Sequence, residues 1–294
     1  MLIALTGATG FVGRHVADAL IARGHAVRAL ARHPERAARL AARGAQIVSG
    51  DLSDADALRA LAGGADVLVH LVGIIVETGA ATFAAVHVEG TRAALAAARA
   101  AGVRRVVHMS AVGARNDPTA TRYHRTKWQA EQLVRESRLP HVIFRPSLVN
   151  GPENVPIRIL ARLHHLLPAV PVFGDGTFPT QPVWVGDVAQ AFALAVERAE
   201  LMGTFELGGP QVLTYEEFVL AIGRAVGRPR RLVHLPLGLV RAAARGFDVL
   251  GPAAPITTDQ LQMLVEGSAT PGNAITSAFG IKPLAFDAGL RRWL

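Results

Sequence analysis

The 294-residue sequence has no cysteine, only two lysines and two tyrosines, and aromatic side chains at 5% of its positions. Without cysteine, disulfide bonds, zinc–thiolate sites and thiol catalysis are excluded. So few aromatic rings argue against a surface on which nucleic-acid bases stack. The lysines are Lys127 and Lys282, so 29 of the 31 basic residues are arginine. Because arginine fills nearly every basic position, a retained lysine draws attention.

Long apolar runs are also missing. The most apolar stretch, residues 67–76, covers ten residues, whereas a helix that spans a bilayer needs roughly 20. The first residues, MLIALTGATG, are typical of a strand and lack the basic segment and cleavage site of a signal peptide. We therefore expect a cytoplasmic protein.

The formal net charge of +8 comes from arginines scattered along predicted helices. This distribution indicates solvated helix faces and no nucleic-acid partner. His164 and His165 have no acidic residues at the spacing of metal ligands, so no metal site is expected.

The first half of the chain alternates between short apolar runs and helical patterns. Strands are predicted at residues 2–6, 26–31, 45–49, 66–72, 104–109 and 141–145, and helices at 11–23, 34–43, 54–61, 82–101 and 121–137. Continuous apolar strands separated by helices predict an α/β fold with a doubly wound parallel sheet, the Rossmann fold. Its ligand is expected beyond the carboxyl ends of the strands, where the strand order reverses.

After about residue 150 the alternation breaks and prolines cluster. We expect an NAD(P)-binding domain at 1–150 and a smaller C-terminal α/β lobe at 151–294 for a substrate or partner. Residues of about 180–200 are expected to return to the main sheet, with Asp187 capping a helix. The segment 228–250 is basic and apolar. A helix packed on the core is favoured there, and a helix on a membrane surface is the alternative.

The first predicted strand leads into the glycine-rich turn TGATGFVG, with glycines at positions 7, 10 and 13. Gly7 allows a tight turn, Gly10 allows the backbone to approach a pyrophosphate, and Gly13 allows the helix to lie close to the sheet. The pyrophosphate would then lie at a helix N-terminus. The residues expected to contact the dinucleotide here are Gly7, Thr9, Gly10, Phe11, Val12 and Gly13.

The second predicted strand ends without the acidic residue that binds the ribose hydroxyl of NAD. Arg32 stands there instead, and arginine pairs with a 2′-phosphate. We therefore expect NADP(H), with NAD(H) as the alternative. Asp51, followed by Leu52, is expected near the adenine, and Leu71, Val72 and Gly73 are expected beneath the ribose.

Tyr123 and Lys127 form the sequence YHRTK, a spacing that places both side chains on one helix face. Two tyrosines and two lysines would show this spacing by chance about once in 70 such sequences. Beside a nicotinamide, the ammonium would lower the pKa of the phenol. The tyrosine would exchange a proton with a carbonyl or alcohol while the lysine holds the ribose.

These motifs, with VHVEGT at 86–91, HMSAVGA at 108–114 and RPSLVNGP at 145–152, resemble the extended or atypical short-chain dehydrogenase/reductase superfamily, whose members include epimerases and dehydratases. FGDGTFPTQPVWVGDVA at 173–189 and FGIKPL at 279–284 resemble the group of the nucleotide-binding accessory subunit of respiratory complex I and its bacterial relatives. The resemblance implies that Tyr123 is the acid/base, that Lys127 binds the ribose, and that Pro146 and Ser147 lie near the carboxamide.

The sequence departs from the superfamily pattern at two places. His87 stands at a position where asparagine is frequent in the superfamily. The usual catalytic serine or threonine would fall at Ala111 or Val112, one or two residues after Ser110. Ser110 remains the candidate third catalytic residue. Two functions follow: an oxidoreductase that acts on a carbonyl, alcohol or quinone-like substrate, or a non-catalytic cofactor-binding scaffold or redox sensor. The second would associate with a respiratory complex or the inner face of a membrane.

Overall fold

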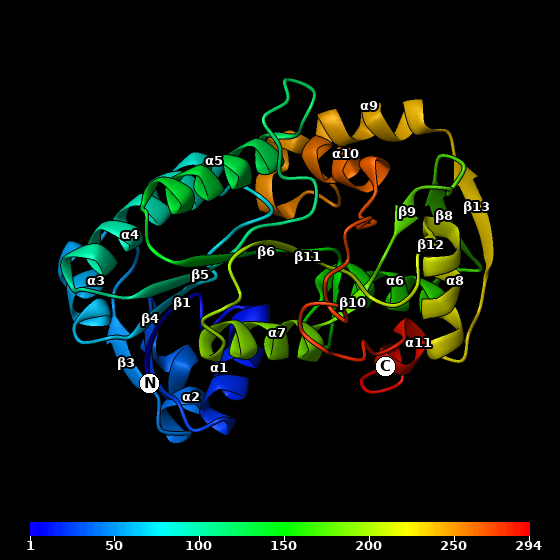
Figure 1. Ribbon diagram of the computed structural model, residues 1–294. Helices are drawn as coiled ribbons and strands as arrows, with labels where there is room; N and C mark the ends of the chain where they lie inside the picture. Colours follow the sequence, from blue (N-terminus) through cyan, green and yellow to red (C-terminus); the bar gives the residue numbers. More distant parts are fainter.

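The computed structural model describes residues 1–294, apart from the side chains of residues 251–253. Its centre is a seven-stranded sheet with the order β11-β6-β5-β4-β1-β2-β3, and all six neighbouring pairs are parallel (Figure 1). The strands are β1 (Leu2–Thr6), β2 (Ala26–Ala31), β3 (Gln46–Ser49), β4 (Val67–His70), β5 (Arg105–Met109), β6 (His141–Pro146) and β11 (Gly203–Leu207). The predicted doubly wound parallel sheet is confirmed.

Two helical layers cover the sheet because successive side chains of each strand point to opposite faces. On β5, Val107 packs with α1 (Phe11–Ala22) and α7 (Val185–Glu197) on one face. Val106 packs with α3 (Ala55–Ala62), α4 (Gly90–Ala100) and α5 (Arg122–Glu136) on the other. Figure 1 shows these layers below and above the sheet.

Several predicted elements differ in detail. The helix expected at 34–43 begins as a 3₁₀ turn, η1 (Pro34–Ala37), and continues as α2 (Ala38–Ala42). The helix expected at 82–101 begins as a π-helix, η2 (Ala84–Glu89), before α4. The prediction that Asp187 caps a helix was wrong. Trp184 occupies the N-cap of α7, and the Asp187 carboxylate accepts from the Leu284 N–H at 2.8 Å.

The second half of the chain contributes both to the main sheet and to a smaller lobe. The helix α7 packs on α1, and β11 extends the sheet beside β6. The lobe has three two-stranded sheets, β7–β10, β9–β12 and β8–β13. Its elements are β7 (Val149–Asn150), α6 (Val155–Leu166), β8 (Ala169–Phe173), β9 (Pro179–Thr180), β10 (Val183–Trp184), β12 (Leu213–Thr214), α8 (Tyr215–Ala225), β13 (Arg231–Leu235), α9 (Leu237–Phe247), η3 (Asp248–Ala253), α10 (Thr258–Glu266) and α11 (Phe286–Leu290).

The strand order reverses between β1 and β4. The chain runs outward from β1 through β2 to β3 and then returns to place β4 on the other side of β1. The carboxyl ends of β1 and β4 therefore form the switch point at which ligands of this fold bind. No helix in the described part of the chain is both long enough and apolar enough to cross a bilayer.

Candidate active site

The glycine turn lies between β1 and α1 at this switch point. Gly7 has φ +77°, and a Cβ atom there would lie 3.0 Å from main-chain atoms of Leu71 and Val72. A Cβ atom on Gly13 would lie 1.9 Å from the Gly7 carbonyl oxygen. Gly10 caps α1 without a hydrogen bond from any described side chain, so the first N–H groups of the helix remain available to an anion. These residues fit the pyrophosphate of a dinucleotide.

Arg32 and Asp51 follow the adjacent strands β2 and β3 and are both exposed. The Asp51 Oδ1 accepts from the hydroxyl and the N–H of Ser53 at 2.6 and 2.8 Å. These bonds, and to a lesser degree the charge of Arg32, lower the pKa of Asp51. Arg28, by contrast, donates to carbonyls at the end of α3, including that of Gly63 at 2.6 Å. Arg28 is thus bound to the end of α3, whereas Arg32, directly after β2, is exposed.

Tyr123 lies in the first turn of α5, which begins where the Thr121 hydroxyl accepts from the His124 N–H at 3.1 Å. Its ring is only 8% exposed and meets the rings of Phe83, His87 and His124 edge-on, with centroids 5.4–5.9 Å away. Burial among these rings raises the pKa of Tyr123 to about 12. The lowered phenol pKa expected from the neighbouring ammonium was therefore wrong.

The Lys127 ammonium binds to the edge of the sheet. The Nζ atom donates to the Met109 carbonyl oxygen at 3.1 Å, at the end of β5. A Cβ atom on Gly73, just beyond β4, would lie 2.9 Å from the same Nζ. Burial lowers the pKa of Lys127 to about 8, and the charge of Glu131 opposes this shift. The lysine thus lies between the ends of β4 and β5, next to the glycine turn.

His87 makes two hydrogen bonds with opposite roles. Its Nε2 accepts from the Ile74 N–H at 3.1 Å, so the ring proton is on Nδ1, which donates to the Thr126 hydroxyl oxygen at 2.9 Å. Burial lowers the pKa of His87 to about 2, so the ring is neutral at physiological pH. The histidine fixes the segment after Gly73 against α5.

A buried ion cluster supports the base of the site, and the sequence reading missed it. Glu131 is fully buried and accepts two hydrogen bonds of 2.7 Å from Arg145 on β6 and one of 2.9 Å from Arg135. The signal was present, because Tyr123, Lys127 and Glu131 follow one another at four-residue intervals on one face of α5.

Ser110 lies directly after β5, and its N–H donates to the Phe144 carbonyl oxygen at 2.7 Å. It is 1% exposed on the α5 side of the sheet, and its proximity contributes to lowering the pKa of Glu131. Its buried hydroxyl makes no hydrogen bond with any described residue. Ala111 and Val112, the alternative positions, are half-buried and carry no hydroxyl.

The remaining predicted contacts lie at the strand ends. Pro146 closes β6, and the Ser147 hydroxyl donates to the Gln181 carbonyl oxygen. Leu71 is buried directly after β4, and Leu52 packs against Gly90 at the start of α4. Thr9, Phe11 and Val12 form the end of the glycine turn and the start of α1.

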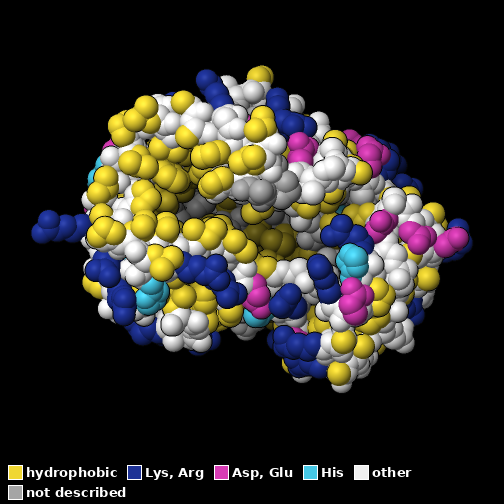
Figure 2. All heavy atoms as spheres, turned by 180° about the vertical axis from the view of Figure 1, so that it is seen from behind, with side chains coloured by type: hydrophobic (Ala, Val, Ile, Leu, Met, Phe, Trp, Pro, Cys, Tyr) yellow, Lys and Arg dark blue, Asp and Glu magenta, His cyan; other side chains and the backbone are white. Residues whose placement is uncertain are grey.

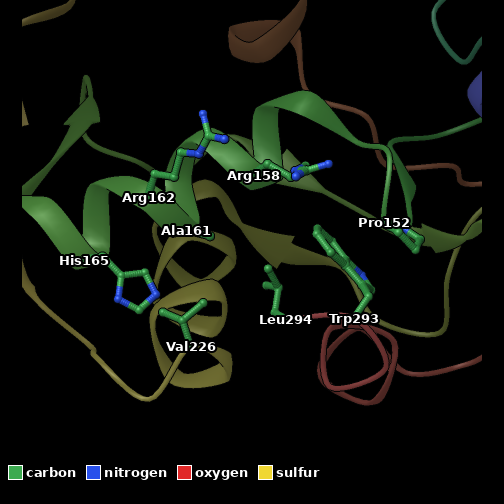
Figure 3. Close-up of a pocket in the computed structure, with 8 residues that line it drawn as sticks. All are labelled: Pro152, Arg158, Ala161, Arg162, His165, Val226, Trp293 and Leu294. Atoms are coloured by element: carbon green, nitrogen blue, oxygen red, sulfur yellow. The ribbon is translucent and has the colours of Figure 1, made fainter.

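A separate pocket of about 340 Å³ lies in the smaller lobe (Figure 3). It is lined by α6, α8 and the chain end, and none of the predicted site residues takes part. Figure 2 shows a different hollow near the centre of the opposite face, with an apolar floor.

The fold and the site define a Rossmann oxidoreductase that binds a nicotinamide dinucleotide, and the comparisons give its family. A family model described as NAD(P)H-binding matches residues 7–168. The chain belongs to this family, within the extended short-chain dehydrogenases/reductases.

Three similar proteins represent this group. A ceramide reductase of Caulobacter vibrioides is 33% identical over 83% of this chain and 76% of its own. Subunit 9 of the mitochondrial NADH dehydrogenase [ubiquinone] 1 alpha subcomplex of Arabidopsis thaliana is 30% identical over 94% of this chain and 71% of its own. The structure of an NADPH-dependent quinone oxidoreductase from Escherichia coli, complexed with NADPH, covers 99% of both chains at 21% identity and a TM-score of 0.79. The predicted superfamily and the likeness to the complex I subunit are confirmed.

Proposed function

We propose that this protein is an NADP(H)-dependent reductase of a carbonyl or quinone-like substrate. The observation that carries the proposal is the position of Tyr123 and Lys127 on one face of α5, with the ammonium at the ends of β4 and β5. Those strand ends adjoin the glycine turn of β1, so a nicotinamide ribose bound there would lie within reach of Lys127.

The high pKa of Tyr123 favours the reductive direction. A phenol with a pKa of about 12 keeps its proton at neutral pH and can give it to a carbonyl oxygen. Bound NADPH would supply a hydride to the carbonyl carbon while the Tyr123 proton goes to the oxygen, so that the C=O bond would become a C–O single bond with new C–H and O–H bonds. Lys127 stays charged below pH about 8 and would donate to the ribose hydroxyls.

The preference for NADP(H) rests on Arg32 at the end of β2 and on the absence of an acidic residue from 19 to 34. An exposed guanidinium at this place suits a 2′-phosphate, whereas a carboxylate would bind the free hydroxyl of NAD. Titration of both reduced cofactors tests this preference, and tighter binding of NADH would overturn it.

Oxidation of NADPH with a panel of ketones, aldehydes and quinones tests the reaction. The chain offers a matched control, because Tyr215 is equally buried and its pKa is also raised to about 12. Loss of turnover in Tyr123→Phe but not in Tyr215→Phe would support the mechanism. Equal rates in the two variants would overturn it.

A second function is favoured by His87 and by the lack of a hydroxyl at positions 111 and 112. The chain would then be a cofactor-binding scaffold or redox sensor, as the likeness to the NADH dehydrogenase subunit suggests. Its signature would be NADPH binding without turnover, together with co-purification with a respiratory complex in the membrane fraction. A protein that turns over without any such partner would reject this function.

A further inference from the structure

One surface of the smaller lobe combines exposed large apolar side chains with arginine. We call it the β13–α9 surface and define it by the exposed side chains of residues 228–250. Leu239 is 69% exposed and Val249 is 87% exposed, and three further large apolar side chains, Val233, Leu235 and Leu250, are also exposed. Figure 2 shows hydrophobic side chains gathered over this part of the molecule, at the upper left. Large exposed apolar patches are typical of interaction sites.

The helix α9 is attached to the lobe by only one of its faces. Val240 and Ala244 are buried in a small cluster with Leu261 of α10. The packing predicted for this helix is therefore present. The opposite face, which includes Leu239, Ala242 and Ala243, is exposed.

The charge of this surface is strongly one-sided. Residues 228–250 contain five arginines and one acid, Asp248. The Asp248 carboxylate accepts from the N–H and the hydroxyl of Thr258 at 2.9 and 2.6 Å. Among the described residues, no carboxylate lies within ion-pair distance of the five arginines, which are Arg228, Arg230, Arg231, Arg241 and Arg245. Arg230 is half-buried and donates to the His164 carbonyl oxygen at 3.1 Å, whereas the other four arginines are exposed. Exposed arginines together with exposed apolar side chains complement a surface that is negatively charged and has an apolar interior.

The β13–α9 surface is connected to the candidate active site through α10. On one side α10 packs under α9. On the other, Gln262 donates to the Thr119 carbonyl oxygen at 2.7 Å, and the Glu266 carboxylate lies 3.3 Å from Nδ1 of His124, the neighbour of Tyr123. Figure 1 shows α10 between α5 and α9. The β13–α9 surface and the residue next to Tyr123 therefore share α10 as a common neighbour.

We propose that the β13–α9 surface docks on an anionic lipid bilayer and that the substrate is a membrane-resident amphiphile with a carbonyl group. The substrate part rests on the proposed reductase function. The aromatic rings around Tyr123, those of Phe83, His87 and His124, suit an apolar chain beside the carbonyl. The relative described as a ceramide reductase is consistent with such a substrate.

Flotation with vesicles tests the docking without any turnover. Vesicles of phosphatidylcholine alone are compared with vesicles that contain about one third phosphatidylglycerol, at low and high salt. We expect the protein to bind the anionic vesicles about tenfold more tightly than the neutral ones and to lose most of this binding in high salt. Equal recovery with both vesicle types would overturn the proposal.

Matched variants assign the binding to this surface. Leu239→Ser with Val249→Ser, and Arg241→Gln with Arg245→Gln, should each weaken vesicle binding about tenfold. The controls are Ile159→Ser with Leu166→Ser, exposed apolar residues of α6, and Arg99→Gln with Arg138→Gln. Controls that lose as much binding as the surface variants would overturn the assignment. Loss of a dimer in the surface variants, without any change in vesicle binding, would also overturn it in favour of self-association.

A turnover comparison separates the two parts of the proposal. NADPH oxidation is followed with a long-chain ketone held in anionic vesicles and with a short ketone in water. The surface variants should lose about tenfold with the vesicle substrate only, and Tyr123→Phe should lose both activities. A surface variant that keeps the vesicle activity would overturn the substrate part. Failure of the wild type with all carbonyls would instead reject the reductase function, and flotation would still decide the docking.

Discussion

Tyr123 in the dinucleotide-binding half and Tyr215 in the smaller lobe are similarly buried, and burial raises the pKa of each to about 12. Their surroundings differ. Tyr215 begins α8 and stacks with Phe173 and Phe218 inside the core of its lobe. Tyr123 begins α5 at the end of the sheet, one turn before a buried lysine. Burial and pKa alone therefore do not identify a catalytic tyrosine.

The two lysines differ in the same way. Lys282 is exposed, whereas Lys127 is 4% exposed and reaches the ends of β4 and β5. A buried ammonium is costly, and it persists where a partner or a function requires it. The contrast between the two regions supports a role in chemistry for the α5 pair only.

The largest difference between the two regions is expected when the phenol hydroxyl is removed from Tyr123 or from Tyr215. Tyr123→Phe should lower kcat for carbonyl reduction by about 10²- to 10⁴-fold, since the proton donor is lost, and should leave the Kd for NADPH unchanged. Tyr215→Phe should keep kcat within about twofold. Steady-state rates and a fluorescence titration with NADPH measure both effects. A comparable loss in Tyr215→Phe would mean that burial, and not position, explains the effect.

The ion cluster beneath Lys127 should be the next most sensitive. Glu131→Gln leaves the half-buried Arg145 without its carboxylate and should lower the free energy of unfolding by about 1–3 kcal/mol. In the smaller lobe, Glu216 pairs with His234 at the surface, and Glu216→Gln should change stability by less than about 0.5 kcal/mol. Denaturant melts at matched pH give both values. Similar losses in the two variants would refute the special status of the α5 cluster.

The sequence predicted the main sheet well because its signals are local. Apolar runs, the glycine turn and the YHRTK spacing each lie within a few residues, and β1 and β2 have the predicted bounds. Asp187 shows the limit of local reading. A carboxylate near a helix start is typical of an N-cap, but here it accepts from Leu284, 97 residues further along the chain.

The chemistry of the site was harder to predict from the sequence, because it depends on contacts that only the fold creates. The pKa of Tyr123 depends on Phe83 and His87, which only the fold brings beside it, so the predicted direction of the shift was reversed. Glu131 on α5 and Arg145 on β6 are 14 residues apart, and their pairing depends on how α5 packs on β6. The roles of Gly7, Gly13 and Arg32 toward a dinucleotide stay predictions that binding experiments must test.

A substitution at Arg32 should have a smaller effect, on cofactor binding, and it again compares the dinucleotide-binding half with the smaller lobe. Arg32→Ala should weaken NADPH binding by about tenfold and leave NADH binding nearly unchanged, because only NADPH carries the 2′-phosphate. Arg224→Ala, an exposed arginine of α8 in the smaller lobe, is the control and should change neither. Titrations with both cofactors measure the ratio. Parallel losses for NADPH and NADH would show that Arg32 contributes only general charge.

The smallest expected effect distinguishes the charge of the Lys127 side chain from its shape, and it is measured as the pH dependence of NADPH binding. With a pKa of about 8, the wild-type ammonium loses its proton as the pH rises past 8, so NADPH binding should weaken by several-fold between pH 7 and 9. Lys127→Arg should remove this pH dependence because a guanidinium stays charged. It should also weaken binding at pH 7 by about threefold to tenfold, since Gly73 and the Met109 carbonyl leave little room for a planar group.

The same measurement on the exposed lysine completes the comparison. Lys282→Arg should bind NADPH as the wild type does and keep the wild-type loss of binding above pH 8. The protein is also expected to gain stability between pH 8 and 10.5, because the unfolded chain still holds the Lys127 proton that the folded chain has lost. Denaturant melts should show this gain in Lys282→Arg and not in Lys127→Met. If the pH dependence of binding survives in Lys127→Arg, another group must titrate there, and the buried ammonium would not be the one that holds the cofactor.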